Sequence, residues 1–166
     1  FVFELASALS NDADVEVITP DSSSKTLSDT RPFRINRVRY APKKLQNLAH
    51  KFGGIPVALK ENKWNYCFVP ALLTAMFFRT LLSSLRADVI QANWGIIGLI
   101  SCLAGKLTRT PVVTTIRGAD ATRAETSIID RAILKFCVKN SRTYIDLIKF
   151  GGILGSQLYL SFFLWQ

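Results

Sequence analysis

Short β-branched runs alternate along the chain with apolar segments of helical spacing, and this alternation is the feature that most constrains the fold. The strands predicted from the β-branched runs span residues 15–19, 33–40, 88–92 and 111–116. The helices predicted from the helical spacing span residues 1–10, 43–52, 69–85, 95–107 and 126–139. Because strands that alternate with helices of this length form βαβ units, we expect an α/β protein with a parallel sheet flanked by helices.

An order of this kind is typical of a Rossmann-like domain, in which ligands bind beyond the carboxyl ends of the strands. That rule selects three loops, at residues 20–24, 93–95 and 117–120. The second and third loops place polar and aromatic residues directly after buried strands, and the candidate site residues are Asn93, Trp94, Arg117, Gly118 and Asp120. We expect these two loops to share one crevice.

Each candidate residue also has a purely structural interpretation. Trp94 is suited to stack on a sugar ring, or to cover the sheet edge as a core residue. Asn93 is suited to bind a hydroxyl group, or to cap the helix that begins near Gly95. The segment Arg117–Asp120 is either a ligand loop, in which Gly118 lets the backbone approach a substrate, or a turn in which Asp120 caps a helix.

Positive charge is concentrated in residues 31–63, which carry nine basic residues and one acidic residue in a chain of net charge +9. The residues that we assign to a membrane or phosphate patch are Arg34, Arg37, Arg39, Lys43 and Lys44. Such a patch is typical of a solvated face, an anionic membrane surface or a site for a phosphorylated ligand. We expect no nucleic-acid partner, because no nucleic-acid-binding motif accompanies the charge.

The cysteines and the single histidine restrict the chemistry further. Cys67, Cys102 and Cys137 are 35 residues apart among apolar neighbours, so the sequence contains no Cys-x-x-Cys pair for metal or redox work. His50 is the only imidazole, which excludes a zinc or iron site built from histidines. We therefore expect no metal and no cofactor, cysteines that act as small core residues, and a reducing, cytoplasmic location.

The apolar segments are too interrupted to predict a membrane-spanning helix, which needs about 20 mostly apolar residues. The uncharged residues 66–78 end at Arg79, so we interpret this stretch as part of a core helix. Peripheral attachment to the inner face of the cell membrane, through the basic patch, is the membrane association that the sequence allows.

Four segments carry a resemblance when they are taken in order: ELASALSNDADVEVITP, RVRYAPKKLQNLAHKFGGIPVALKENK, ADVIQANWGIIGLI and TPVVTTIRGAD. Together they resemble the N-terminal domain of family 4 retaining glycosyltransferases, which have the GT-B fold. The third segment is similar to the Asp-Val-Ile-His-Ala-His-Trp stretch of that family, and the fourth to its Pro-Val-Val-x-Thr-x-His-Gly-x-Asp stretch. The resemblance covers residues 1–140.

The resemblance implies that Arg117 and Asp120 act at the catalytic centre, and that Asn93, Trp94 and Gly118 bind substrate. The chain departs from the family pattern at Gln91 and Asn93, which stand where the family has histidines. Arg117 replaces the histidine that contacts the transferred sugar in the family. An arginine stays protonated and cannot act as a base, but it can hold a phosphate or carboxylate through two N–H groups.

We expect the family's first strand, the glycine-rich loop that follows it and its C-terminal domain to be missing from this sequence. We therefore expect residues 1–140 to be an incomplete acceptor-side domain, which is the N-terminal half of a GT-B fold. Residues 141–166 form an apolar tail that we leave unassigned. It is a divergent end, the product of a disrupted reading frame, or the terminus of a fragment. Because the donor-binding domain is missing, we expect these 166 residues to be inactive by themselves.

These observations predict a fragment of a glycosyltransferase of cell-envelope polysaccharide biosynthesis. The intact enzyme would transfer a sugar from a nucleotide-sugar donor to a polysaccharide or glycolipid acceptor, with retention of configuration. The alternative is a non-catalytic Rossmann-like module, or a gene remnant, that binds an anionic membrane surface through residues 31–63.

Overall fold

The computed structural model describes residues 2–21, 32–46, 48, 58–59 and 61–147. The chain is a mixed α/β protein with two compact units, unit 1 at residues 1–79 and unit 2 at residues 80–166. The boundary between the two units falls inside the helix α3 (Phe68–Ser84). Each unit contains one small parallel sheet, so the described residues hold two sheets where we expected a single one.

Unit 1 contains α1 (Val2–Leu9) and the parallel strands β1 (Glu16–Pro20) and β2 (Arg34–Val38), with Val17 opposite Ile35. The β-branched run of the sequence forms β1 as expected, and the strand includes Pro20. Two short 3-10 turns follow, η1 (Lys43–Leu45) and η2 (Lys63–Cys67). Among the described residues of this unit, the buried apolar ones are Ala6, Phe33, Val38, Tyr40, Leu48, Ala58, Leu72 and Met76.

The prediction of a helix that begins at residue 43 is wrong for the described part of that segment. A single 3-10 turn forms and ends at Gln46, whose φ of −81° and ψ of 60° are not helical. The Gln46 side chain instead donates a hydrogen bond to the carbonyl oxygen of Ala41 (2.6 Å), which stabilises the turn. Residues 49–52 of the predicted helix lie outside the described residues.

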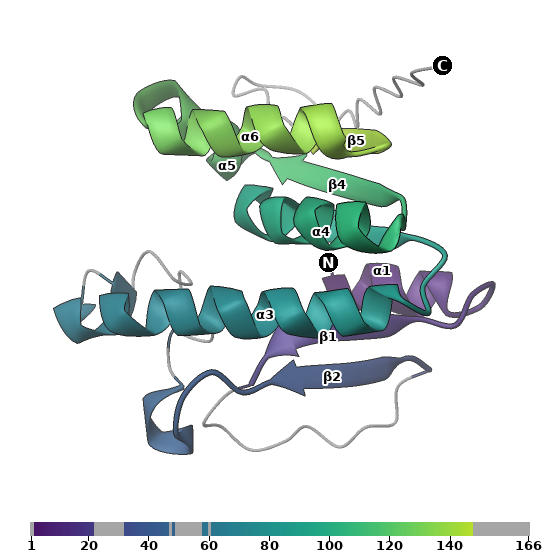
Figure 1. Ribbon diagram of the computed structural model, residues 1–166, viewed down its shortest axis with the longest axis horizontal. Helices are drawn as coiled ribbons and strands as arrows, with labels where there is room; N and C mark the ends of the chain where they lie inside the picture. The colour runs from purple at the N-terminus through teal and green to yellow at the C-terminus, as the bar shows by residue number, and fades with distance from the viewer. Residues whose placement is uncertain (1, 22–31, 47, 49–57, 60, 148–166) are drawn as a thin grey trace, which may run out of the picture. The chain divides into compact units, whose positions relative to one another are not determined.

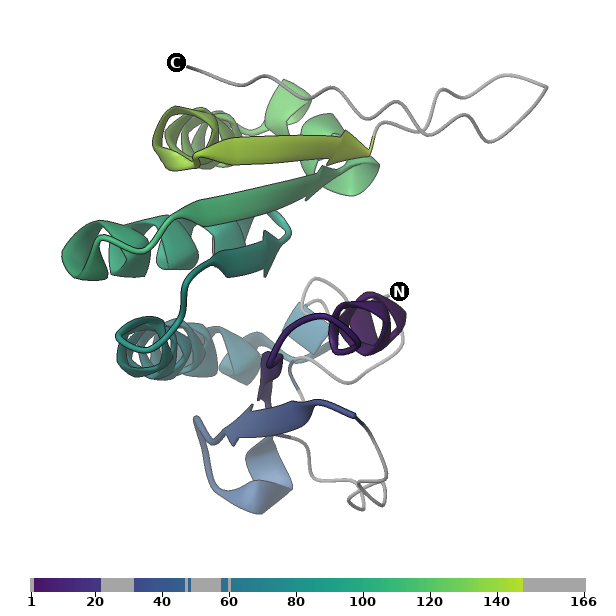
Figure 2. The same ribbon diagram turned by 90° about the vertical axis from the view of Figure 1, so that its right-hand side faces the viewer.

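Unit 2 is built around three parallel strands in the order β3 (Ile90–Asn93), β4 (Val112–Arg117) and β5 (Thr143–Leu147). Figure 2 shows the three strands side by side with their arrowheads at the same end. The helices α4 (Gly95–Thr108) and α6 (Ile128–Asn140) pack on each other and against β4 (Figure 1). The sequence therefore predicts the βαβ arrangement of this unit correctly.

Two elements of unit 2 extend what the sequence indicated. A separate helix, α5 (Gly118–Thr126), follows β4 without an intervening loop, so the predicted loop at 117–120 is a strand end joined to a helix start. The strand β5 lies in the segment that the sequence left unassigned, and it pairs with β4 from Val113 opposite Thr143 to Arg117 opposite Leu147. Residues 148–166 of the predicted tail lie outside the described residues.

Candidate functional site

The carboxyl ends of β3 and β4 place the candidate residues of unit 2 next to one another. The two strands are in register from Ile90 opposite Val112 to Asn93 opposite Thr115. The backbone N–H of Trp94 then donates to the carbonyl oxygen of Thr115 (3.0 Å), which holds the start of α4 against β4. Two of the three predicted ligand loops therefore meet at one sheet edge. The third, at residues 20–24, lies in unit 1, and its residues 22–24 are outside the described residues.

Trp94 adopts a backbone conformation that is rare for any residue other than glycine, with φ 70° and ψ 150°. Such a conformation costs about 1–3 kcal/mol and persists only where the surrounding structure imposes it. Here the N–H bond to Thr115 and a hydrogen bond from the Gly98 N–H to the Trp94 carbonyl (2.8 Å) impose it. The side chain is 41% exposed, so Trp94 is not a core tryptophan. Strain of this kind at an exposed aromatic residue is typical of functional sites.

We expect Trp94→Gly to be more stable to unfolding than Trp94→Ala by about 1 kcal/mol, because glycine adopts this conformation without a steric penalty. Urea denaturation followed by circular dichroism measures the difference. At Ile96, in the first turn of α4, the same pair of substitutions should have the opposite order, since glycine weakens an ordinary helix by about 1 kcal/mol relative to alanine. Equal stabilities for the two Trp94 variants would show that the backbone at this position is not strained.

Arg117 packs on the ring of Trp94. Its guanidinium carbon lies 4.9 Å from the centroid of the indole, within the range of a cation–π interaction. The Arg117 side chain is half-buried, and it extends from the last residue of β4. The stack gives the guanidinium plane a defined orientation at the sheet edge, which favours recognition of a planar anion through paired N–H groups.

Asp120 is buried in the first turn of α5, where both of its carboxylate oxygens accept hydrogen bonds. Oδ2 accepts from the backbone N–H of Arg117 (3.3 Å), and Oδ1 accepts from Nη2 of Arg123 (2.8 Å). The first bond is a helix cap, which is one of the two interpretations of Asp120 that the sequence allowed. Asp120 therefore fixes the backbone of Arg117, while Arg123 balances its charge.

Asn93 is only 9% exposed, and its side-chain oxygen Oδ1 has no hydrogen-bond partner among the described residues. Of the two interpretations of Asn93, the helix cap does not form, because Trp94 occupies the N-cap position of α4 and makes no side-chain capping bond. A buried acceptor without a partner costs about 1–3 kcal/mol. A hydroxyl or N–H group of a ligand would satisfy it. The neighbouring Gln91 is engaged elsewhere, since its Nε2 donates to Oγ1 of Thr115 (2.7 Å).

Gly118 begins α5 next to Arg117, and its carbonyl oxygen accepts a hydrogen bond from Oγ1 of Thr122 (2.9 Å).

Sequence reasoning missed Arg123 as a member of this cluster. The spacing of three residues between Asp120 and Arg123 was the available signal, because side chains three apart meet on one face of a helix. That signal requires a helix at 118–126, which the sequence did not predict.

The basic patch predicted in unit 1 is partly balanced by acidic side chains. Arg34 forms an ion pair with Asp14, and Nε of Arg39 lies 3.3 Å from the Asp21 carboxylate. Arg37 is half-buried on β2, Lys43 is exposed on η1, and the side chain of Lys44 is outside the described part of the chain. Three of the four side chains in these pairs are exposed, so each pair contributes no more than about 1 kcal/mol to stability.

Two exposed aromatic residues follow this segment in the sequence. Trp64 is 77% exposed and Tyr66 is 59% exposed, both on η2, and the backbone N–H of Trp64 donates to the side-chain oxygen of Asn62 (3.0 Å). The stretch Trp64–Ser84 has the length and composition of a membrane-spanning helix, and 22% of its most apolar window is buried. Large aromatic side chains at this exposure are common where a protein meets a lipid interface.

Among the described residues, no three His, Cys, Asp or Glu side chains are grouped closely enough to hold a metal ion. No protein-family model matches the chain, and no curated protein shows significant similarity to it.

Proposed function

We propose that the chain is the acceptor-side domain of a retaining glycosyltransferase with the GT-B fold, and that the cluster at the ends of β3 and β4 binds a saccharide. The observation that carries this proposal is the stack of Arg117 on the strained, exposed Trp94 at the carboxyl edge of a parallel sheet. Carboxyl edges of such sheets are where ligands bind in related architectures. The resemblance of the segments around both residues to the family motifs supports the same conclusion.

Each residue has a separate task in this proposal. The indole of Trp94 offers an apolar face to the C–H groups of a sugar ring. The Arg117 guanidinium binds a carboxylate, a phosphate or a pair of hydroxyl oxygens, while Asn93 Oδ1 accepts a hydrogen bond from a hydroxyl group. Asp120 is a positioning residue, because it holds the Arg117 backbone rather than contacting the ligand.

In the intact enzyme, the sugar would pass from a nucleotide diphosphate to an acceptor hydroxyl group. Negative charge develops on the departing diphosphate, and cationic groups lower the energy of that transition state. A protonated Arg117 near the transferred sugar would contribute in this way. It would replace the histidine of the family motif without acting as a base.

Saccharide binding by the 166-residue chain tests the proposal directly. In saturation-transfer NMR with neutral, uronic-acid-containing and phosphorylated oligosaccharides, Trp94→Ala and Arg117→Ala should each weaken binding about tenfold or more, from lost stacking and charged hydrogen bonds. Trp64→Ala is the matched control, since it removes an exposed tryptophan of unit 1 and should leave binding unchanged. Equal binding by the Trp94 and Trp64 variants would contradict the assignment of the site.

A membrane-binding module is the second candidate function, and the exposure of Trp64 and Tyr66 favours it specifically. Basic residues near an anionic leaflet contribute about 1 kcal/mol each. The ion pairs of Arg34 and Arg39 reduce that contribution here. Interfacial burial of the two aromatic rings would therefore supply a large share of the affinity.

Vesicle co-sedimentation tests this second function. Binding to vesicles of phosphatidylserine and phosphatidylcholine should fall about tenfold or more in a Trp64→Ala, Tyr66→Ala double variant, because both rings leave the lipid interface. Trp94→Ala should bind vesicles as the parent does. Unchanged binding by the double variant, or equal binding to vesicles without phosphatidylserine, would contradict an aromatic and basic docking surface.

A further inference from the structure

Two buried cysteines face each other between the helices of unit 2. Cys102 lies on α4 and Cys137 on α6, and both are fully buried. The two thiols are close enough for a hydrogen bond between them, and the Cys137 sulfur also lies 3.3 Å from the carbonyl oxygen of Gly95. Gly98 permits this approach, because a Cβ at that position would lie 3.0 Å from the Cys137 sulfur.

Hydroxyl groups surround the sulfur of Cys102. Its Sγ lies 3.4 Å from Oγ of Ser141, and that oxygen lies 2.7 Å from Oγ1 of Thr114. If Thr114 donates to Ser141, the Ser141 hydroxyl is left to donate to the sulfur. A chain of donors that ends at Cys102 stabilises a thiolate at that position and not a thiol.

The surroundings shift the pKa values of the two thiols in opposite directions. Hydrogen bonding from Cys137 lowers the pKa of Cys102 to about 6, and this outweighs the opposing effect of burial. Bonds from Ser141 and Thr114, with the charge of Lys106, act in the same direction. The pKa of Cys137 is raised above its usual range by the hydrogen bond to Cys102 and by burial, with smaller contributions from the charges of Cys102 and Asp120. These opposite shifts, with the hydroxyl group of Ser141 beside the Cys102 sulfur, favour Cys102 as the nucleophile of the pair.

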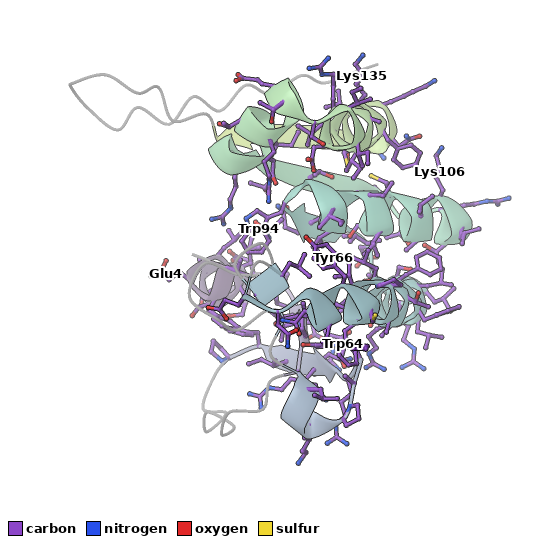
Figure 3. All side chains as sticks on the ribbon, turned by 90° about the vertical axis from the view of Figure 1, so that its left-hand side faces the viewer. Glu4, Trp64, Tyr66, Trp94, Lys106 and Lys135 are labelled. Atoms are coloured by element: carbon purple, nitrogen blue, oxygen red, sulfur yellow. The ribbon has the colours of Figure 1, made fainter. Side chains whose placement is uncertain are left out.

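A cationic depression of about 340 Å³ leads toward Cys102 from the amino end of the sheet. Its wall includes Cys102 and three basic residues, Lys106, Arg109 and Arg142, and none of its described lining residues is acidic. Figure 3 shows Lys106 near the opposite end of α4 from Trp94, so this depression is separate from the candidate saccharide site. Cationic surroundings of this kind favour reactive thiolates.

From the paired thiols, the hydroxyl chain and the cationic depression, we infer that Cys102 and Cys137 form a peroxide-sensitive dithiol, in which Cys102 is oxidised first and Cys137 then closes a disulfide. This inference is independent of the proposed glycosyltransferase function. It assigns a modification site to residues that the sequence suggested were inert core residues.

The chemistry balances with a peroxide as the oxidant. The Cys102 thiolate attacks one oxygen of hydrogen peroxide, the O–O bond breaks, and Cys102 sulfenic acid and hydroxide form. The Cys137 sulfur, after loss of its proton, then attacks the Cys102 sulfur. The S–O bond breaks, the disulfide forms and one water is released, so one peroxide is reduced for each pair of thiols oxidised.

Mass spectrometry of the whole chain after treatment with hydrogen peroxide tests this inference. Cys67→Ala serves as the parent for these experiments, because Cys67 is exposed on η2 and would react on its own. Peroxide should remove two hydrogens from this parent, with a Cys102–Cys137 disulfide in the peptide map that dithiothreitol reverses. Cys137→Ala should instead accumulate a sulfenic acid on Cys102 that dimedone labels, and Cys102→Ala should leave Cys137 unmodified.

Three results would overturn the inference: retention of both thiols after treatment, oxidation beyond the sulfenic acid without a disulfide, or a sulfenic acid on Cys137 in the Cys102→Ala variant. Circular dichroism shows whether each variant is folded, and Cys137→Ser replaces Cys137→Ala if the latter is not. Ser141→Ala gives a second measurement. It should slow the oxidation of Cys102 without changing the product, whereas an unchanged rate would remove the hydroxyl chain from the mechanism.

Discussion

Gly105→Ala is expected to lower the free energy of unfolding of unit 2 by about 3 kcal/mol, through overpacking that rigid neighbours cannot relieve. A Cβ at Gly105 would lie 2.5 Å from Cγ2 of Val112 and 2.6 Å from the carbonyl oxygen of Thr110. The second contact is with backbone, so a change of rotamer does not remove it. Without such contacts, the same substitution inside a helix would stabilise the protein by about 1 kcal/mol.

Gly95→Ala is the matched control for this prediction. Its Cβ would lie 2.9 Å from Cδ2 of Leu134, the end of a flexible side chain, so the cost should be small. Urea denaturation on a Trp64→Phe, Trp165→Phe background lets the emission of Trp94 report on unit 2. If Gly105→Ala were as stable as Gly95→Ala, α4 could not approach β4 as closely as the structure places it.

The Gly105→Ala substitution should also affect the candidate site. The N–H of Thr110 donates to the carbonyl oxygen of Gly105 (3.0 Å), and Arg109 turns the chain in a left-handed conformation. This turn delivers the chain from α4 into β4 and sets β4 in register with β3. That register places Arg117 beside Trp94, so a displaced turn would disturb the saccharide site from the far end of the helix.

The sequence predicted the regular elements of unit 2 because hydrophobic periodicity and burial agree there. Five of the six residues of β4 are β-branched and the strand is mostly buried, while α4 is apolar with glycines where it approaches the sheet. The meeting of Trp94 and Arg117 followed from the rule that parallel strands end at the same edge. These features depend on patterns that extend over many residues, which a single sequence displays.

Features that depend on one contact were not predicted. The short helix α5 has few apolar residues, so its periodicity is weak, and its start is fixed by the single bond from Arg117 N–H to Asp120. The positive φ of Trp94 results from hydrogen bonds to Thr115 and from Gly98, neither of which a local pattern reveals. The facing of Cys102 and Cys137 likewise requires the packing of α4 on α6, which spacing along the chain does not encode.

The second large effect is expected at Gly98, and it should be reversible by a change in its neighbour. A Cβ at Gly98 would lie 2.7 Å from Cγ2 of Thr114 and 3.0 Å from the sulfur of Cys137. Both side chains are fully buried, so Gly98→Ala should cost about 2 kcal/mol of unfolding free energy. Because Gly98 also donates to the Trp94 carbonyl, the same variant should disturb the strained conformation at the candidate site.

Thr114→Ser removes the methyl group that causes the shorter contact and keeps the hydroxyl that bonds Ser141. Alone it should cost about 1 kcal/mol, the value of one buried methyl group. The double variant with Gly98→Ala should have a free energy of unfolding about 1 kcal/mol or more above the value expected from the sum of the single changes, because the two substitutions share one contact. Combined with Gly105→Ala, Thr114→Ser should restore nothing, since that clash involves Val112 and the Thr110 backbone. If the costs were additive in both double variants, the Thr114 methyl group would not limit the approach of α4 to β4. The close packing of α4 between the thiol pair and the saccharide site would then not depend on the contact between Gly98 and Thr114.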